Sequence, residues 1–288
     1  MDFADALRVA GLRPRSIVAD GKWRRCPTDD KPKKRNGAYV LSVGGRSGAF
    51  KNYALDQEWH QWRMDGAQPS RLEREEWRRR ERLRAAEERR KHAKAASVAA
   101  DMLARAVALT PRDGTRWRAG VPAHPYLARK GLHDAPYLDL DGVLLVPMRD
   151  RDTDALIGMQ TIDRDGAKRY LPGSRAKGAV HRLGRGRELW LCEGYATGLS
   201  IRAGLAALYR QDQVVVCFSA GNLVEVASAL RGRVIADHDA SGTGRSAAER
   251  TGLPWAMPEE PGDANDLHQR GGIGAVRALL QRALAYRA

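Results

Sequence analysis

From residue 188 to the C-terminus, short apolar runs alternate with segments of helix-forming composition, and this alternation constrains the fold more than any other feature. The first three apolar runs are residues 189–192, 214–218 and 234–236. Apolar strands that are connected by helices form a parallel sheet with both faces covered. The sequence therefore predicts an α/β domain with helices over residues 195–208, 222–230 and 245–251 and a final helix near the C-terminus.

Acidic residues follow three apolar runs of this region. Glu193 follows the first run, Asp237 and Asp239 follow the third, and Asp263 and Asp266 lie in a loop after a short run at 255–257. The carboxyl ends of parallel strands meet at one edge of a sheet, so we expect these carboxylates to converge there. Aspartate is also an ordinary turn former, but mutually repelling carboxylates are commonly neutralised by a hard divalent cation. The ordered combination therefore favours a Mg²⁺ site.

The order of these motifs resembles the Toprim domain of primases and topoisomerases over about residues 186–270. Glu193 with the glycine after it, Asp237-x-Asp239 and the third acidic loop carry the match. The resemblance implies a Rossmann-like parallel sheet flanked by helices. It also implies that Glu193, Asp237 and Asp239 are catalytic ligands of Mg²⁺ or Mn²⁺, with Asp263 as an accessory acid and Asp266 as a further ligand.

Two positions depart from the Toprim pattern of cellular primases. Thr197 stands where those proteins usually have a further acid, four residues after the glutamate, and Asn265 replaces the second acid of the last loop. We therefore expect fewer metal ions or a redistributed set. The departures also leave open a replication accessory protein that binds DNA without turnover.

The segments that precede the acids distinguish among Toprim proteins. Residues 145–150 and 156–158, followed by the basic run 168–178, resemble the basic half of the bacterial-type primase catalytic core. Residues 124–132, together with 192–197, are similar to primases of phages and plasmids. The family pattern implies that a set of basic residues binds template or incoming nucleotide, namely Arg149, Lys168, Arg169 and Lys177.

Residues 1–66 carry aromatic residues among glycines and short alternating runs, which is typical of a small β-rich module. The module resembles the zinc ribbon of related primases with its ligands lost, because Cys26 is its only cysteine, and we expect no structural zinc. Tyr39, Phe50 and Tyr53 are expected in its core. Basic residues with interleaved aromatics predict contacts to single-stranded DNA through Trp23, Arg24, Arg25, Lys33, Lys34 and Arg35.

Residues 71–109 contain no glycine or proline and predict one long helix that ends before Pro111. Its first half is nearly polar all round, whereas an apolar stripe that includes Ala99 and Val107 marks the second half. We divide the chain into an N-terminal module (1–66), a helical linker (67–110), a basic α+β primase core subdomain (111–187) and a Toprim catalytic domain (188–288).

The chain is strongly basic, with 50 Lys and Arg against 35 Asp and Glu and a formal charge of +15. This balance favours a polyanionic partner such as nucleic acid. No run of about 18 apolar residues and no signal peptide occur, so we expect a cytoplasmic protein without membrane contact. A G-x-x-x-x-G-K-[ST] loop is also absent, which predicts a separate replicative helicase as a partner.

These features together predict a DNA primase that makes short oligonucleotide primers from nucleoside triphosphates on a single-stranded DNA template. We expect these primers to be RNA. The required cofactor is Mg²⁺ or Mn²⁺. Two alternatives remain open: a Toprim nuclease that uses the same acids for hydrolysis, and a non-catalytic DNA-binding replication accessory.

Overall fold

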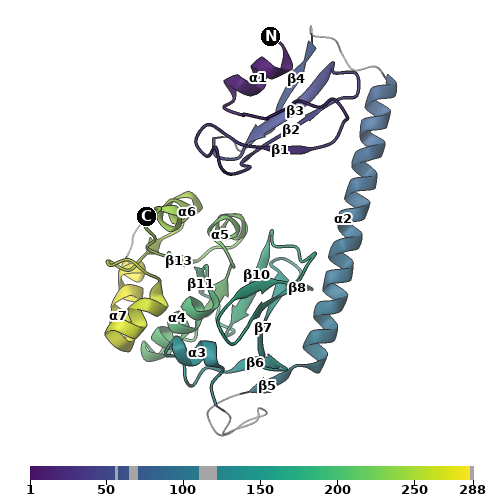
Figure 1. The fold of residues 1–288 in the computed structure, drawn as a ribbon. Helices are drawn as coiled ribbons and strands as arrows, with labels where there is room; N and C mark the ends of the chain where they lie inside the picture. The colour runs from purple at the N-terminus through teal and green to yellow at the C-terminus, as the bar shows by residue number, and fades with distance from the viewer. Residues whose placement is uncertain (56–57, 65–70, 110–121, 286–288) are drawn as a thin grey trace. The chain divides into compact units, whose positions relative to one another are not determined.

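The computed structural model describes residues 1–55, 58–64, 71–109 and 122–285 of the chain (Figure 1). The protein is a mixed α/β protein, as expected, and it divides into two compact units, residues 1–85 and 86–288. Residues 67–70 and 110 of the expected linker and residues 111–121 of the expected 111–187 subdomain lie outside the described residues. Among the described helices, none combines the length and the apolar composition needed to cross a bilayer.

The first unit contains a short helix and a four-stranded antiparallel sheet in the order β1-β2-β3-β4. Asp2 caps the helix by accepting a hydrogen bond from the N–H of Asp5 (2.7 Å). One face of the sheet packs on this helix through the ring of Phe3, which lies 5.1 Å from the ring of Trp62. The elements are α1 (Phe3–Val9), β1 (Arg24–Cys26), β2 (Gly37–Leu41), β3 (Ser47–Asn52) and β4 (His60–Arg63).

The core of this unit confirms the expectation for Tyr39 and Phe50, which are 2% and 8% exposed. The expectation for Tyr53 is wrong, because its side chain is 48% exposed. Tyr53 follows the end of β3, and its ring centre lies 5.3 Å from Nζ of Lys51, which points to the face of the sheet opposite Phe50. The β-rich character of the module is confirmed.

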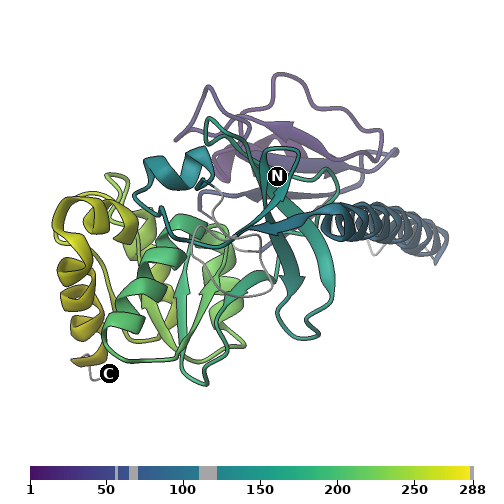
Figure 2. The same cartoon turned by 90° about the horizontal axis from the view of Figure 1, so that it is seen from below.

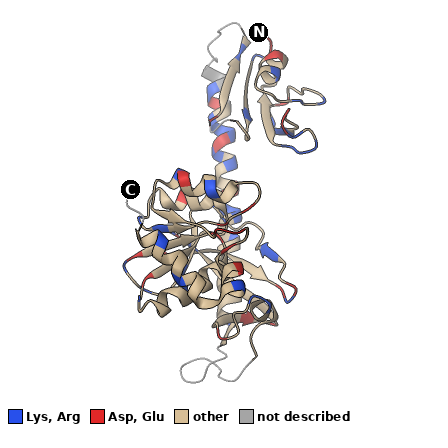
Figure 3. Cartoon of the chain, turned by 90° about the vertical axis from the view of Figure 1, so that its left-hand side faces the viewer, with Lys and Arg blue, Asp and Glu red and all other residues tan. Residues whose placement is uncertain are grey.

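Helix α2 (Arg71–Arg105) begins in the first unit and ends in the second. Basic and acidic residues alternate along it (Figure 3). In the second unit Ala99 is fully buried against Leu145 and Met159 of the sheet, which confirms the docked second half. The expected helical end is wrong: residues Val107–Leu109 form strand β5, whose backbone pairs with β6. Val107 is β-branched, which favours a strand over a helix. Pairing with β6 gives the backbone N–H and C=O groups hydrogen-bond partners that a further helical turn would otherwise provide.

The parallel part of the second unit has the strand order β14-β13-β11-β12 within a larger sheet. Helices α4 and α7 cover one face and lie side by side, whereas α5 and α6 pack on the other (Figures 1 and 2). The predicted parallel sheet with covered faces is therefore confirmed. Its elements are β11 (Leu189–Cys192), α4 (Tyr195–Ala207), β12 (Gln213–Val216), α5 (Ala220–Ala227), β13 (Arg233–Ile235), α6 (Thr243–Thr251), β14 (Trp255–Ala256) and α7 (Ala264–Ala285).

An antiparallel part continues the same sheet without a break. Strand β10 pairs antiparallel with β7 on one side and with β12 on the other, so ten strands form one mixed sheet. The basic segment and the acidic strand ends are thus held by one hydrogen-bonded framework. The elements are α3 (Pro125–Arg129), β6 (Tyr137–Leu140), β7 (Val143–Asp150), β8 (Leu156–Ile162), β9 (Lys168–Tyr170) and β10 (Ala179–Leu183).

Candidate active site

Three acidic segments meet at the carboxyl edge of the parallel strands. Glu193 follows β11, and Asp237 lies just after β13, the parallel neighbour of β11. The segment with Asp237 is tied to the loop before α7 by two backbone hydrogen bonds between His238 and Gly262 (2.9 and 3.0 Å). Asp263 follows Gly262 directly, so the backbone brings Glu193, Asp237 and Asp263 to one place.

Asp237 is the least satisfied acid of this edge. Its Oδ1 atom is buried without a hydrogen-bond partner. Burial, followed by the charges of Glu193 and Asp263, raises the pKa of Asp237 to about 7, whereas Lys168 opposes the rise. A buried carboxylate oxygen without a donor carries a desolvation cost that a bound cation would remove. Asp237 therefore has the chemistry of a metal ligand.

Glu193 shares this environment. Its side chain is half-buried, and burial, followed by the charge of Asp239, raises its pKa. The backbone N–H of Ala220, at the start of α5, favours the ionised form and limits the rise. The charge of Glu193 in turn raises the pKa of Asp237, so the carboxylates of this edge repel one another.

Asp239 is held in a different way. Its Oδ1 accepts hydrogen bonds from the N–H groups of Ser241 (3.0 Å) and Thr243 (3.1 Å), and its Oδ2 accepts one from Gly244 (2.7 Å). The side-chain hydrogen bond from Ser241, together with these backbone donors, lowers the pKa of Asp239 to about 2. Gly244 is required here, because a Cβ would collide with the Asp237 carbonyl. Asp239 therefore fixes the start of α6 as an ionised carboxylate.

The last acidic loop is also organised by its own backbone. Asp263 Oδ1 accepts from the N–H groups of Asn265 (2.7 Å) and Asp266 (2.9 Å), while Asp266 Oδ2 accepts from the N–H of Asp263 (3.1 Å). The other oxygen of Asp266 faces Lys130 Nζ at 3.3 Å. Burial alone would raise the pKa of Asp266, but the Asp263 N–H and Lys130 lower it overall. Asp266 is consequently directed toward Lys130.

In the part of the chain that the structure describes, no three His, Cys, Asp or Glu side chains are grouped closely enough to hold a metal ion as they stand. The donor set nevertheless fits a hard cation, because it is all oxygen and includes the unpartnered Oδ1 of Asp237. The metal ligation by Glu193, Asp237, Asp239, Asp263 and Asp266 stays a prediction.

Among the four predicted nucleotide or template contacts, Lys168 lies with the acids. It lowers the pKa of Asp237, and its Nζ lies 5.8 Å from the ring centre of Tyr126. Strand β9, which carries Lys168, is held beside the end of β12 because Tyr170 Oη donates to the carbonyl of Phe218 (3.2 Å). A basic residue is thus placed at the acidic edge by the sheet itself.

The other three basic residues contact local acids. Arg149 donates to the carbonyl of Asp154 (2.8 Å), Arg169 pairs with Asp163 (3.2 Å), and Lys177 pairs with Glu225 of α5 (3.4 Å). The side chains of Arg169 and Lys177 are 70% and 78% exposed. Exposed pairs of this kind contribute little stability and exchange readily for another anion.

Asn222 is a positioning residue that sequence reasoning missed. Its buried amide donates to the carbonyls of Ala179 (2.8 Å) and Cys217 (2.7 Å) and accepts from the N–H of Gly178 (2.8 Å). These bonds clamp the loop that carries Lys177 to the end of β12. Nothing in the sequence distinguishes Asn222 from an ordinary polar residue in the first turn of a helix.

Tyr126 is a second missed residue, although it lies in the 124–132 segment. Its side chain is 4% exposed, yet its hydroxyl is buried without a hydrogen-bond partner. Burial, followed by the charge of Asp263, raises its pKa to about 12. The hydroxyl is therefore a neutral donor close to the acidic edge.

The departure at Asn265 has a structural explanation. Its side chain is fully buried and donates to the carbonyl of Lys130 (2.9 Å) and to Ser200 Oγ (3.0 Å). An amide can make both donations, whereas a carboxylate cannot. Asn265 thus joins the α3 region, α4 and α7 behind the acids.

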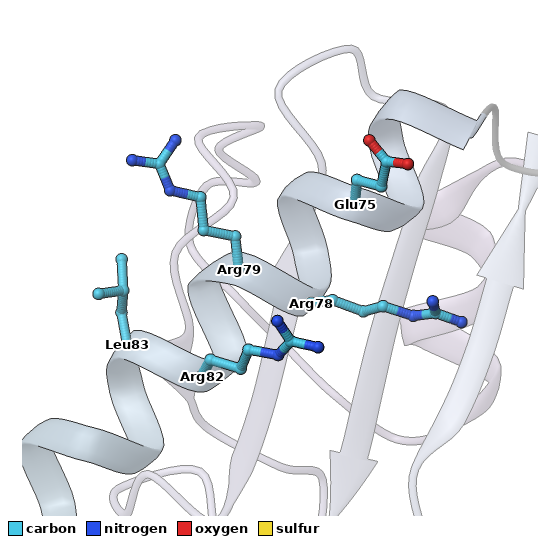
Figure 4. A pocket seen from close by; sticks show the side chains of 5 residues that line it. All are labelled: Glu75, Arg78, Arg79, Arg82 and Leu83. Carbon is cyan, nitrogen blue, oxygen red and sulfur yellow. The ribbon is translucent and has the colours of Figure 1, made fainter.

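The predicted DNA contacts lie in the first unit. Trp23 is 39% exposed, and Arg25 and the run Lys33, Lys34 and Arg35 are exposed as well. Arg24 differs from them because it is half-buried and pairs with Asp20 (2.7 Å). The role of all six residues in DNA binding stays a prediction. A shallow pocket of this unit, on α2, is lined instead by Glu75, Arg78, Arg79, Arg82 and Leu83 (Figure 4).

No protein-family model matches the chain. Among solved structures, the chain is similar to part of the complex of bacteriophage T7 lagging-strand DNA polymerase with the primase domains of two gp4 subunits, bound to an RNA/DNA hybrid and dTTP. This match has 16% identity and a TM-score of 0.38, and it covers 57% of this chain and 87% of that chain. The chain is also similar to the RNA polymerase domain of Mycobacterium tuberculosis primase DnaG, at 19% identity and a TM-score of 0.35. That match covers 51% of this chain and 57% of that chain. Both are partial similarities of fold to structures whose names include a primase.

Proposed function

We propose that this chain is a primase of the phage and plasmid type, with a Toprim catalytic domain. It synthesises short RNA primers from nucleoside triphosphates on single-stranded DNA. The observation that carries the proposal is the meeting of three acidic segments at one sheet edge, where Asp237 Oδ1 is buried without a partner and Lys168 lies nearby. A site with surplus carboxylates and an adjacent cation suits a metal-bound triphosphate.

In this reaction the 3′-oxygen of one nucleotide forms a bond to the α-phosphorus of the next, and the bond to the departing pyrophosphate breaks. Mg²⁺ or Mn²⁺, when bound, supplies positive charge at the phosphate oxygens. Glu193, Asp237 and Asp263 would hold the cation. Asp239 holds Gly244 of α6 close to the Asp237 backbone, and its charge raises the pKa of Glu193.

The basic residues bind the anionic substrates in this proposal. Lys168 acts as a point charge on the triphosphate, because the fold already holds it beside the acids. Arg149, Arg169 and Lys177 exchange their contacts with Asp154, Asp163 and Glu225 for phosphates of nucleotide or template. The net charge of +15 supports the polyanionic template. A separate replicative helicase would supply unwound DNA.

A non-catalytic DNA-binding accessory is the second candidate. The observation that favours it is the engagement of Asp239 with the α6 loop and of Asp266 with Lys130, which leaves fewer carboxylates for metal. The two candidates differ in turnover, and both bind DNA.

The test is incubation of the full chain with single-stranded DNA, labelled nucleoside triphosphates and Mg²⁺ or Mn²⁺, beside the Glu193→Gln protein. We expect short labelled oligomers from the unmutated chain only, with DNA binding unchanged in the variant. A shortened template without oligomers would instead indicate the nuclease. DNA binding without either product would indicate the accessory protein.

A further inference from the structure

The two faces of the N-terminal sheet differ in a way that the proposed catalytic centre does not explain. One face, which carries Tyr39 and Phe50, packs on α1. The strand register places Arg25 opposite Ala38 and Ala38 opposite Lys51, in one row across β1, β2 and β3. Neighbouring residues of a strand point to opposite faces, so this row lies on the face that α1 leaves uncovered.

Three large aromatic side chains gather on that uncovered face. Trp23, Tyr53 and Trp59 are 39%, 48% and 43% exposed. The rings of Trp23 and Trp59 are 4.3 Å apart between centres, and Tyr53 meets Trp59 edge-on at 6.1 Å. They come from different parts of the chain, before β1, after β3 and before β4. We call Trp23, Tyr53 and Trp59 the aromatic patch.

Two cations lie over these rings. The guanidinium carbon of Arg25 is 4.4 Å from the centre of the Tyr53 ring. Lys51 Nζ is 5.3 Å from the same ring and 5.9 Å from that of Trp59. The patch therefore presents π faces and positive charge together, rather than the polar side chains that usually cover the open face of an antiparallel sheet.

The chemistry of the patch favours one class of ligand. Bases without a pairing partner offer flat π faces for stacking, and their backbone carries a negative charge at each nucleotide. An apolar protein surface would use the rings but would have to desolvate Arg25. The strong positive charge of the chain further favours a polyanion.

We propose that the aromatic patch binds single-stranded nucleic acid by stacking unpaired bases on Trp23, Tyr53 and Trp59, with Arg25 and Lys51 beside the backbone phosphates. The identification of this strand as the primase template rests on the proposed function. It extends the predicted DNA contacts to Tyr53, Trp59 and Lys51. It leaves out Arg24, which shares the opposite face with its register partner Tyr39 and is paired with Asp20.

The test compares two ligands of equal length and charge in the full chain, namely oligo(dT) and an abasic oligomer, by fluorescence anisotropy. Stacking predicts that the unmutated protein binds oligo(dT) at least about tenfold more tightly than the abasic strand. The triple variant Trp23→Ala/Tyr53→Ala/Trp59→Ala should bind both equally and weakly. Equal affinity of the unmutated protein for the two strands, or a preference that survives in the triple variant, would overturn the proposal.

Matched variants separate stacking from misfolding and from catalysis. Trp77→Ala removes an aromatic side chain of α2 that is 62% exposed and should leave the preference for oligo(dT) intact. Trp59→Phe keeps a smaller ring and should retain part of the preference, so loss of folding cannot imitate the result. Asp237→Asn should abolish primer synthesis and keep the preference. If primer synthesis is absent from the unmutated chain while the preference is present, the proposed function fails and the stacking site remains.

Discussion

The carboxyl edge of the parallel sheet and the uncovered face of the N-terminal sheet both hold side chains that folding alone does not explain, but their energetic costs differ. At the edge, a carboxylate oxygen of Asp237 is buried without a donor, which typically costs about 1–3 kcal/mol or more for a charged group. On the sheet face, Trp23, Tyr53 and Trp59 each keep at least 39% of their surface exposed to water, at little cost. The comparison teaches that one ligand site can be recognised by the desolvation free energy of a buried, unpartnered group, and another by aromatic side chains that remain exposed.

The largest effect is expected when the carboxylate of Asp237 at the sheet edge is replaced by a neutral amide. Asp237→Asn should reduce primer synthesis by more than about 1,000-fold, because the site loses a carboxylate ligand that the metal ion requires. The same change should raise the melting temperature, since it removes a buried and repelled carboxylate. Gel assays of primers and thermal unfolding measure the two effects.

Asp212→Asn is the matched control, because this carboxylate is well paired with Trp190 Nε1 (2.9 Å) and Arg210 Nε (2.6 Å). It should lower stability and leave primer synthesis unchanged. A loss of stability in Asp237→Asn comparable to that in Asp212→Asn would remove the distinction between the two carboxylates.

Truncation of an aromatic side chain should destabilise the protein much more on the covered face of the N-terminal sheet than on the uncovered face. Phe50→Ala removes a core ring and should cost about 3–5 kcal/mol of unfolding free energy. Tyr53→Ala removes an exposed ring and should change it by less than about 1 kcal/mol. Urea unfolding of the full chain, followed by far-UV circular dichroism, measures both; similar losses would mean that the uncovered face serves folding.

Two buried tyrosines of one core offer a smaller and sharper comparison. Tyr126→Phe should lower primer synthesis about tenfold without loss of stability, because its hydroxyl has no partner to lose in the fold. Tyr137→Phe should leave primer synthesis unchanged and lower stability. The Tyr137 hydroxyl donates to the carbonyl of Pro122 (2.9 Å), and this hydrogen bond contributes about 1 kcal/mol to the free energy of unfolding. Unchanged activity in Tyr126→Phe would remove this residue from the site.

The smallest effect concerns pH. The pKa of Asp237 is raised to about 7 by burial, so the folded state binds its proton more tightly and this group makes stability fall between about pH 4 and 7. Burial lowers the pKa of His181 to about 4, so this group makes stability rise between about pH 4 and 6.5. The contributions of these two groups to the pH dependence of stability therefore have opposite signs between about pH 4 and 6.5.

Because the falling contribution of Asp237 is removed, the melting temperature of the Asp237→Asn protein relative to the unmutated chain should increase from pH 5 to pH 6.5. Thermal scans without divalent cations measure the difference. Parallel curves for the two proteins would show that Asp237 titrates normally.

The parallel sheet was predictable because apolar runs and helical connections repeat along the chain, and because acids at strand ends share an edge once the strands are parallel. Strand β5 was missed, since its pairing with β6 depends on residues far along the sequence. The exposure of Tyr53 depends on which way one strand faces, and a shift of one residue reverses that.

Within the site, the sequence identified residue types but not their partners. The hydrogen bonds of Asp239 to the α6 loop arise from local backbone geometry, and the contact of Asp266 with Lys130 joins residues that are more than a hundred positions apart. The unpartnered hydroxyl of Tyr126 is likewise a property of packing, which no pattern of residue types encodes.

Binding of Mn²⁺ to the full chain, followed by the electron paramagnetic resonance signal of the free ion at pH 7.5, tests the acidic edge most directly. The unmutated and Asp212→Asn proteins should bind Mn²⁺ with the same affinity, and Asp237→Asn should bind it at least about tenfold more weakly, because a ligand and a full charge are lost. Equal Mn²⁺ affinity in the unmutated and Asp237→Asn proteins would contradict a metal-dependent catalytic site at this edge.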